Sequence, residues 1–157
     1  MGADASINER VLAMIPQQRP FRFIDEILEL NGSHIRAAYR FREDEYFYAG
    51  HFPGNPITPG VILIEAMAQA GVVALGVGIL LEQGVPAEQI KEMTTLFAYA
   101  ETVEFAGTVR PGERIVIQGQ KQYFRKGNIK TNASICRENG ESVCSGVLAG
   151  TGVKLDA

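Results

Sequence analysis

The fold is decided by the stretch Gly60–Gln83, which reads GVILIEAMAQAGVVALGVGILLEQ. Thr58 is predicted to cap a helix here, with Pro59 in its first turn, and Gly84 and Pro86 are predicted to end it. Its 24 residues would span roughly 36 Å at about 1.5 Å per residue. Because this helix is apolar nearly all round, we expect it to be buried on most sides, at the centre of the fold.

The composition of the chain is that of a globular protein. Of its 157 residues, 46% are hydrophobic and 21% are charged, which argues against disorder. The net charge of −3 lacks the basic excess of a nucleic-acid binder, so we expect no nucleic acid as a partner. Two cysteines, Cys136 and Cys144, make neither a disulfide framework nor a zinc site.

The first twenty residues contain no apolar segment of the kind found in secretory signals. The longest unbroken apolar run, Ala70–Leu81, has 12 residues, whereas a membrane-spanning helix needs about 20. We therefore expect no membrane partner and a cytoplasmic location. With no linker or repeat along the chain, residues 1–157 are expected to form a single domain.

The N-terminal part of the chain predicts a short helix and a β-hairpin. Ser6 is expected to cap a helix that runs to about Met14, and Phe21–Leu30 is expected to form a strand. Asn31-Gly32 predicts the following turn, because both residues tolerate positive φ. The return strand alternates, with Ile35, Ala37, Tyr39 and Phe41 on one face and Arg36 and Arg40 on the other.

The C-terminal part is typical of an antiparallel meander. Its four strands are expected near Met93–Phe105, Glu113–Phe124, Asn128–Glu138 and Ser142–Val153. Turns are expected at Pro111-Gly112, Lys126-Gly127 and Asn139-Gly140. Together with the first two strands and the apolar helix, these strands predict an α+β fold in which a curved antiparallel sheet wraps a long central helix. Such a sheet leaves edges and a face to cover, so we expect a dimer.

Two titratable side chains flank the start of the central helix. His51 lies in Glu43–Pro59, a segment rich in aromatics, Pro and Gly, which predicts a long ordered loop of the kind that is often functional. Glu65 is the only charged residue between His51 and Leu81. Burial raises the pKa of a carboxyl, so Glu65 is a candidate general acid near neutral pH. Gln69 lies four residues on, on the same helix face, where it can hold that carboxyl by a hydrogen bond.

The helix start supplies a third chemical group. The early N–H groups of a helix have no partner within the helix, and the N-terminus carries partial positive charge. Gly60 has no Cβ to keep a ligand away from its N–H, so a carbonyl oxygen can accept a hydrogen bond there and be polarised. A base at His51, an acid at Glu65 and this donor fit removal of a proton α to a carbonyl with loss of a β-hydroxyl.

These residues belong to a longer motif. Gly50–Val61 reads GHFPGNPITPGV and Glu65–Gln69 reads EAMAQ. The motif resembles the signature of the β-hydroxyacyl-ACP dehydratases, the FabZ/FabA group, and Glu at position 65 resembles the FabZ type. The resemblance covers most of the chain from Ile15 to about Cys144. It implies a hotdog fold, two paired subunits that share active sites, and no metal or organic cofactor.

The resemblance also implies roles for individual residues. His51 matches the histidine that removes the α-proton, and Glu65 matches the acid, supplied by the other subunit, that assists departure of the hydroxyl. Gly60 matches the N–H that binds the thioester carbonyl, and the Ile57 carbonyl oxygen matches the group that orients the histidine ring. Gln69 matches the residue that steadies the acid. The expected substrate-binding residues are Gly60, Ile57, Gln69, Phe52 and Val61.

The activity implied by the resemblance is that of a lyase, which converts (3R)-hydroxyacyl-ACP to trans-2-enoyl-ACP and water in fatty-acid or related acyl-chain biosynthesis. Its partners would be the acyl carrier protein and a second copy of the chain, with a trimer of dimers as a larger assembly. Two alternatives stay open. One is a hotdog acyl thioesterase in which Glu65 activates water, and the other is a catalytically silent hotdog subunit that binds acyl chains.

The sequence departs from the family at the surface that docks the carrier protein. The family often carries basic residues after the Phe that matches Phe105, whereas Ala106 and Gly107 follow it here. Other basic residues are therefore candidates for this docking, namely Arg110, Arg114, Lys121, Arg125 and Lys126.

Overall fold

The computed structural model describes residues 3–154, and the side chains of residues 7–154. The helical segments are α1 (Ala3–Met14), α2 (Gly60–Ala68), the π-helical turn η1 (Gln69–Ala74), α3 (Leu75–Glu82) and α4 (Ala87–Lys91). The strands are β1 (Glu26–Leu30), β2 (His34–Arg40), β3 (Met93–Phe105), β4 (Arg114–Arg125), β5 (Asn128–Arg137) and β6 (Ser142–Lys154).

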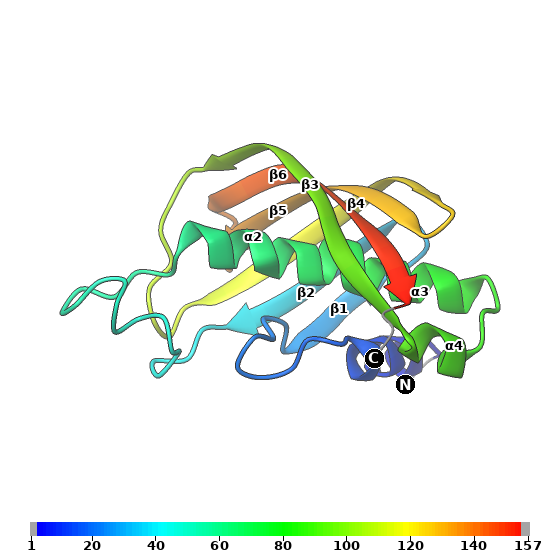
Figure 1. Cartoon of the computed structure of the whole chain (residues 1–157). Coiled ribbons are helices and arrows are strands. Elements are labelled where there is room, and N and C mark those ends of the chain that lie inside the picture. Colours follow the sequence, from blue (N-terminus) through cyan, green and yellow to red (C-terminus); the bar gives the residue numbers. More distant parts are fainter. Residues whose placement is uncertain (1–2, 155–157) are drawn as a thin grey trace.

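The strands form one six-stranded antiparallel sheet in the order β1-β2-β4-β5-β6-β3. The segments α2, η1 and α3 follow one another without a break and make one long central helix, around which the sheet curls (Figure 1). The predicted α+β architecture, a long helix wrapped by a curved antiparallel sheet, is confirmed. Its physical basis is the all-round apolar surface of the helix, which the inner face of the sheet removes from water.

The central helix and the sheet approach each other closely at two glycines, Gly71 and Gly119. A Cβ on Gly119 of β4 would lie 2.9 Å from the Cα of Gly71 in η1. Next to this contact, the Thr131 hydroxyl of β5 donates a hydrogen bond to the Gly71 carbonyl oxygen at 2.8 Å. The two glycines therefore set the spacing between helix and sheet at this point.

The four C-terminal strands begin and end within one residue of their predicted bounds. The three predicted turns are also confirmed, since Gly112, Gly127 and Gly140 have φ values of 86°, 76° and 92°, which glycine adopts without steric cost. The alternation predicted for the return strand of the hairpin holds as well, because Ile35, Ala37, Tyr39 and Phe41 are buried and Arg40 is exposed.

Two predictions for the N-terminal part are wrong. The first helix begins at Ala3, so position 6 lies inside it and is not its N-cap position. The first strand begins at Glu26, and the preceding residues from Phe21 onward form no strand. Their polar groups are bonded elsewhere. The Arg22 guanidinium donates to the carbonyl oxygen of Leu12 in α1 and to those of Ile15 and Gln17 just after it.

The hairpin turn is present, but its conformation differs from the prediction. Neither Asn31 nor Gly32 has positive φ. Instead, the Asn31 side-chain oxygen accepts hydrogen bonds from the N–H groups of Ser33 and His34, at 2.7 and 2.9 Å. A short polar side chain that bonds the following backbone is a second way for Asn to make a turn.

The start of the central helix corrects a third prediction. Pro59 occupies the N-cap position, and no side chain caps the helix. Thr58 does not cap it, because its hydroxyl is hydrogen-bonded to the Tyr48 hydroxyl at 2.7 Å. The early N–H groups of α2 are therefore not consumed by a capping side chain.

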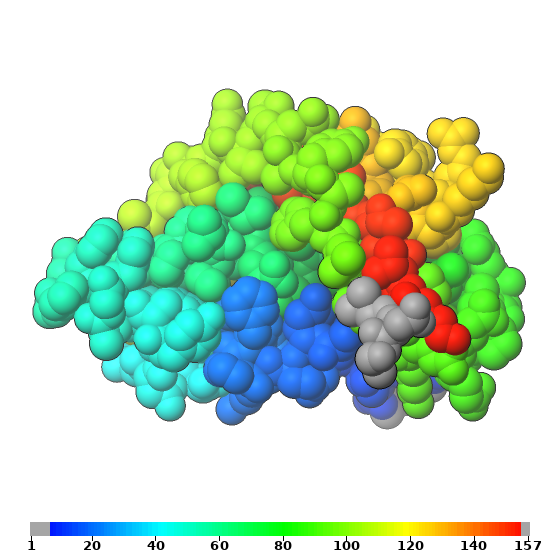
Figure 2. Space-filling model, in the orientation of Figure 1, coloured from blue at the N-terminus to red at the C-terminus, as the bar shows by residue number. Residues whose placement is uncertain are grey.

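Gly60–Glu82 is long and apolar enough to cross a membrane, but 89% of its most apolar window is buried inside the fold. The core helix of a water-soluble protein meets the same criteria of length and composition, so this segment is a core helix. In the space-filling view, neighbouring segments cover much of it, and the loop that carries His51 gathers at one end of the molecule (cyan, Figure 2).

Candidate functional site

The predicted long loop joins β2 to α2 and is anchored at two points. Near its start, the carboxylate of Glu45 is buried and accepts hydrogen bonds from the Tyr39 hydroxyl and the Arg42 N–H. Near its end, Tyr48 and Thr58 share the hydroxyl hydrogen bond described above. Burial raises the pKa of Tyr48 to about 12, so its hydroxyl stays protonated at neutral pH. These contacts anchor the loop on both sides of His51.

His51 lies between those anchors and has a defined ring orientation. Its Nδ1 is 2.8 Å from the Ile57 carbonyl oxygen. A carbonyl only accepts hydrogen bonds, so Nδ1 carries the proton and Nε2 of the neutral ring is free to accept one. The Phe52 ring stacks on the imidazole, with centroids 4.1 Å apart and planes at 23°. The half-buried imidazole is therefore held in the tautomer that a general base requires.

Gly60 is the first residue of α2, and its N–H donates no hydrogen bond among those of the described chain. The Phe105 ring of β3 lies directly beside it, because a Cβ on Gly60 would be 2.9 Å from a ring carbon. The next residue, Val61, is 71% exposed. An N–H at a helix N-terminus that has no partner can donate a hydrogen bond to the carbonyl oxygen of a bound molecule. The Phe105 ring borders this position.

Glu65 lies one turn into α2 and is half-buried. Burial raises the pKa of its carboxyl, and a hydrogen bond from Gln69 partly opposes that rise. The Gln69 Nε2 donates to Glu65 Oε2 at 2.9 Å. A half-buried carboxyl with a raised pKa can hold a proton closer to neutral pH than an exposed one.

Gln69 also contacts a segment that the sequence did not connect to the site. Its Oε1 accepts from the Phe23 N–H at 2.7 Å, and its Nε2 donates to the Phe21 carbonyl oxygen at 2.8 Å. No periodicity or spacing pattern indicates this pairing, because the partners lie 46 and 48 residues away from Gln69 and are backbone groups.

The single chain does not join all of the predicted site residues. One helix carries Gly60, Glu65 and Gln69, and one loop carries Ile57, His51 and Phe52. Among the described residues, no hydrogen bond or ion pair links His51 to Glu65. Large apolar side chains remain exposed on the loop, the helix start and the edge strand β3, namely Phe52, Val61, Leu96, Phe97, Tyr99 and Phe105.

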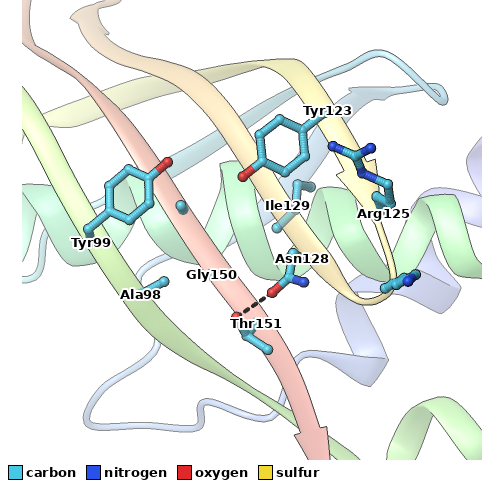
Figure 3. A pocket seen from close by; sticks show the side chains of 10 residues that line it. Ala98, Tyr99, Tyr123, Arg125, Asn128, Ile129, Gly150 and Thr151 are labelled. Carbon is cyan, nitrogen blue, oxygen red and sulfur yellow. Dashed lines mark hydrogen bonds between the residues drawn. The ribbon is translucent and has the colours of Figure 1, made fainter.

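A hollow of about 360 Å³ lies on the outer face of the sheet, apart from His51, Gly60 and Glu65. Tyr99 of β3 and Tyr123 of β4 face each other across it, and Arg125 lies at its end (Figure 3). Neither His51 nor Glu65 lines this hollow, so it is not part of the candidate site.

Among residues 3–154, no three side chains of His, Cys, Asp or Glu lie together in a group able to hold a metal ion.

Comparison with known families matches residues 15–146 to the FabA-like domain. The chain is 36% identical over 141 residues to the 3-hydroxyacyl-[acyl-carrier-protein] dehydratase FabZ of Caldicellulosiruptor bescii, covering 89% of this chain and 94% of the relative. It is also 36% identical over 140 residues to FabZ of Thermomicrobium roseum, covering 88% and 87% of the two chains.

Solved structures agree on the fold. The dehydratase heterocomplex ApeI:P of Xenorhabdus doucetiae superposes with a TM-score of 0.72 at 16% identity, covering 90% of this chain and 89% of that chain. A hypothetical thioesterase of Streptococcus pneumoniae, solved with coenzyme A, has a TM-score of 0.55 at 10% identity, covering 84% and 88%. The sheet wrapped around a central helix is thus a hotdog fold. This chain belongs to the FabA-like family of 3-hydroxyacyl-ACP dehydratases, as shown by the match over residues 15–146 and by its FabZ relatives.

Proposed function

We propose that the chain dehydrates (3R)-hydroxyacyl-ACP to trans-2-enoyl-ACP and water, in fatty-acid or related acyl-chain biosynthesis in the cytoplasm. The observation that carries the proposal is the combination of an imidazole held with Nε2 free, a half-buried carboxyl with a raised pKa, and an unpartnered N–H at the helix start. The names of its FabZ relatives describe the same reaction.

The proposed reaction uses each of these groups once. The Gly60 N–H donates a hydrogen bond to the thioester carbonyl oxygen and stabilises negative charge on this oxygen as the α-carbon loses its proton. His51 Nε2 takes that proton. The electron pair forms the α,β double bond, the bond from the β-carbon to the hydroxyl breaks, and Glu65 donates the proton with which the hydroxyl leaves as water.

The proposed site is completed in a homodimer, which can assemble further into a trimer of dimers. This part of the proposal is supported by the edge position of β3, by the exposed apolar side chains on β3, and by the 71% exposure of Val61 beside the helix start. A long edge strand with apolar side chains favours pairing with another strand. In this arrangement His51 of one subunit acts with the acid of the partner subunit.

The proposed docking partner is the acyl carrier protein. Of the basic residues considered for docking, Arg110 contacts the His51 loop, since its guanidinium donates to the Asn55 side-chain oxygen at 3.0 Å. Arg114 is engaged in ion pairs with Glu26 and Glu138, so it is a weaker candidate for docking. Arg110 is therefore the residue that we expect to contact the carrier beside the candidate site.

The proposed activity is tested by a hydration assay. Purified protein should hydrate a trans-2-enoyl-ACP, and His51→Ala should lower kcat by about 10²–10⁴-fold, the usual contribution of a general base. The matched control is His34→Ala, because His34 lies in β2 and its Nδ1 is hydrogen-bonded to Asn31. We expect the control variant to keep full activity.

The same assay separates the alternatives. Release of free thiol without hydration of the enoyl group would identify a thioesterase, and binding of enoyl-ACP without turnover would identify a silent subunit. Full hydration by His51→Ala would remove His51 as the base. Circular dichroism spectra of the variants must match the wild type, so that a loss of activity is not a loss of fold.

A further inference from the structure

The Gln69 side chain makes two backbone contacts that the proposed reaction does not use. It is 0% exposed and is bonded to the backbone of Phe21 and Phe23 as well as to the Glu65 carboxyl. An amide NH₂ group has two hydrogens. Both are donated here, one to the Phe21 carbonyl oxygen and one to Glu65 Oε2.

The two backbone contacts fix which way the Gln69 amide points. A backbone N–H can only donate, so the atom facing Phe23 must be the amide oxygen. A carbonyl can only accept, so the atom facing Phe21 must be the nitrogen. A flipped amide would place donor against donor and acceptor against acceptor in a buried position, which is costly. The orientation therefore does not depend on whether Glu65 is protonated.

A fixed Gln69 nitrogen restricts the neighbouring carboxyl. Because Nε2 can only donate, Glu65 Oε2 has to accept in both protonation states. In the protonated carboxyl, the carbonyl oxygen is a better hydrogen-bond acceptor than the hydroxyl oxygen, so the contact with Gln69 favours the hydrogen on Oε1. Within the described chain Oε1 has no hydrogen-bond partner, and it is not among the buried polar atoms that lack one, so it reaches the surface.

We propose that the Phe21–Phe23 backbone, acting through Gln69, keeps the acidic proton of Glu65 on Oε1 and thereby makes Oε1 the oxygen that delivers it. Phe21–Phe23 and Gln69 are positioning groups in this proposal, because they act through Glu65. The catalytic meaning rests on the proposed function, but the position of the proton does not. Burial and the Gln69 hydrogen bond are the influences on the Glu65 pKa within the described chain, where no charged side chain contributes.

Infrared spectroscopy tests the position of the proton directly. The C=O stretch of a protonated carboxyl moves to lower frequency when its carbonyl oxygen accepts a hydrogen bond. The Glu65 band is identified by its loss in Glu65→Gln. In Gln69→Leu we expect this band to move to higher frequency and the pKa of Glu65 to rise further, because the carboxylate loses its donor. We also expect kcat for hydration to fall by about 10–100-fold with little change in KM.

A second variant covers the case in which Gln69→Leu does not fold. Gln69→Met approximates the length of glutamine but offers no NH₂ group, so the Glu65 band should again move to higher frequency. The control is Gln83→Leu, an exposed position at the end of α3, which should leave both the band and kcat unchanged.

The results separate this proposal from the proposed function. A Glu65 band that keeps its frequency in the Gln69 variants would overturn the placement of the proton, whatever the activity. A shifted band in a protein whose wild type does not hydrate enoyl-ACP would support the placement and refute the function. A shifted band with unchanged kcat would overturn the role of Oε1 in proton delivery.

Discussion

Adding one methyl group where the central helix meets the sheet should destabilise the protein measurably. In Gly119→Ala, the new Cβ would lie 2.9 Å from the Gly71 Cα, 3.1 Å from Thr131 Cγ2 and 3.2 Å from Ile35 Cγ2. The first of these atoms belongs to the helix backbone and cannot rotate away. The helix must therefore move away from the sheet by several tenths of an ångström.

The size of the effect follows from the contact distances. Overpacking a close-packed core by one methyl group costs about 1–3 kcal/mol, and the backbone contact places Gly119→Ala in the upper half of that range. For a chain of this length, each kcal/mol lowers Tm by roughly 2–4 °C, so we expect Tm to fall by roughly 4–12 °C. Gln69 lies two residues before Gly71, so the displacement should also disturb the Glu65 contact and lower kcat.

Urea denaturation at a fixed protein concentration measures the change, because dimerisation would make stability depend on concentration. The control is Gly76→Ala in α3, where a Cβ would meet no atom within 4 Å. Alanine is the better helix former by about 0.5–1 kcal/mol, so this variant should be stabilised. If Gly119→Ala unfolds at the wild-type urea concentration, the two glycines do not set the spacing between helix and sheet.

Three further predictions concern other buried groups. Tyr39→Phe removes a hydroxyl that donates to the buried Glu45 carboxylate, so the free energy of unfolding should fall by about 1–3 kcal/mol; an unchanged urea midpoint would show that the loop does not need this anchor. Burial raises the pKa of Glu65 in the folded chain, so the stability linked to its protonation is complete below the ordinary carboxyl pKa and is lost as pH rises through the raised pKa. The wild type should therefore lose stability relative to Glu65→Gln as pH increases, whereas parallel curves of unfolding free energy against pH would contradict this. Burial also raises the pKa of the Cys144 thiol to about 11. At about pH 8 a thiol reagent should therefore label only Cys136 in the folded protein and both cysteines after unfolding. Two fast-reacting thiols in the folded protein would count against the burial of Cys144.

Local sequence patterns were sufficient for most of the fold. The strands of the meander were predicted to within one residue, because alternation marks their faces and glycines with positive φ mark their ends. Patterns failed where distant partners decide the structure. Arg22 is bonded to carbonyl groups in and just after α1, and the Phe23 N–H is bonded to Gln69, so the segment before β1 is held by helices and not by a neighbouring strand.

The candidate site also has features that the sequence predicted and features that it did not. Glu65 and His51 could be singled out from the sequence, because a lone carboxyl in an apolar helix and a histidine in a Gly/Pro-rich loop are locally unusual. The orientation of the Glu65 carboxyl could not be predicted from the sequence, because it depends on Gln69 and, through Gln69, on the Phe21–Phe23 backbone. The residue types were thus visible, but their geometry required the tertiary structure.

The π-helical turn Gln69–Ala74 is a part of this geometry that the sequence patterns did not predict. Residues two positions apart in a helix point to nearly opposite sides, at about 100° per residue. At this turn Gln69 is bonded to the segment before β1 on one side, while Gly71 contacts β4 and β5 on the other. The helix is therefore fixed from both sides one turn beyond Glu65. Widened turns of this kind often occur at functional sites, and here the widening begins at the residue that holds the carboxyl.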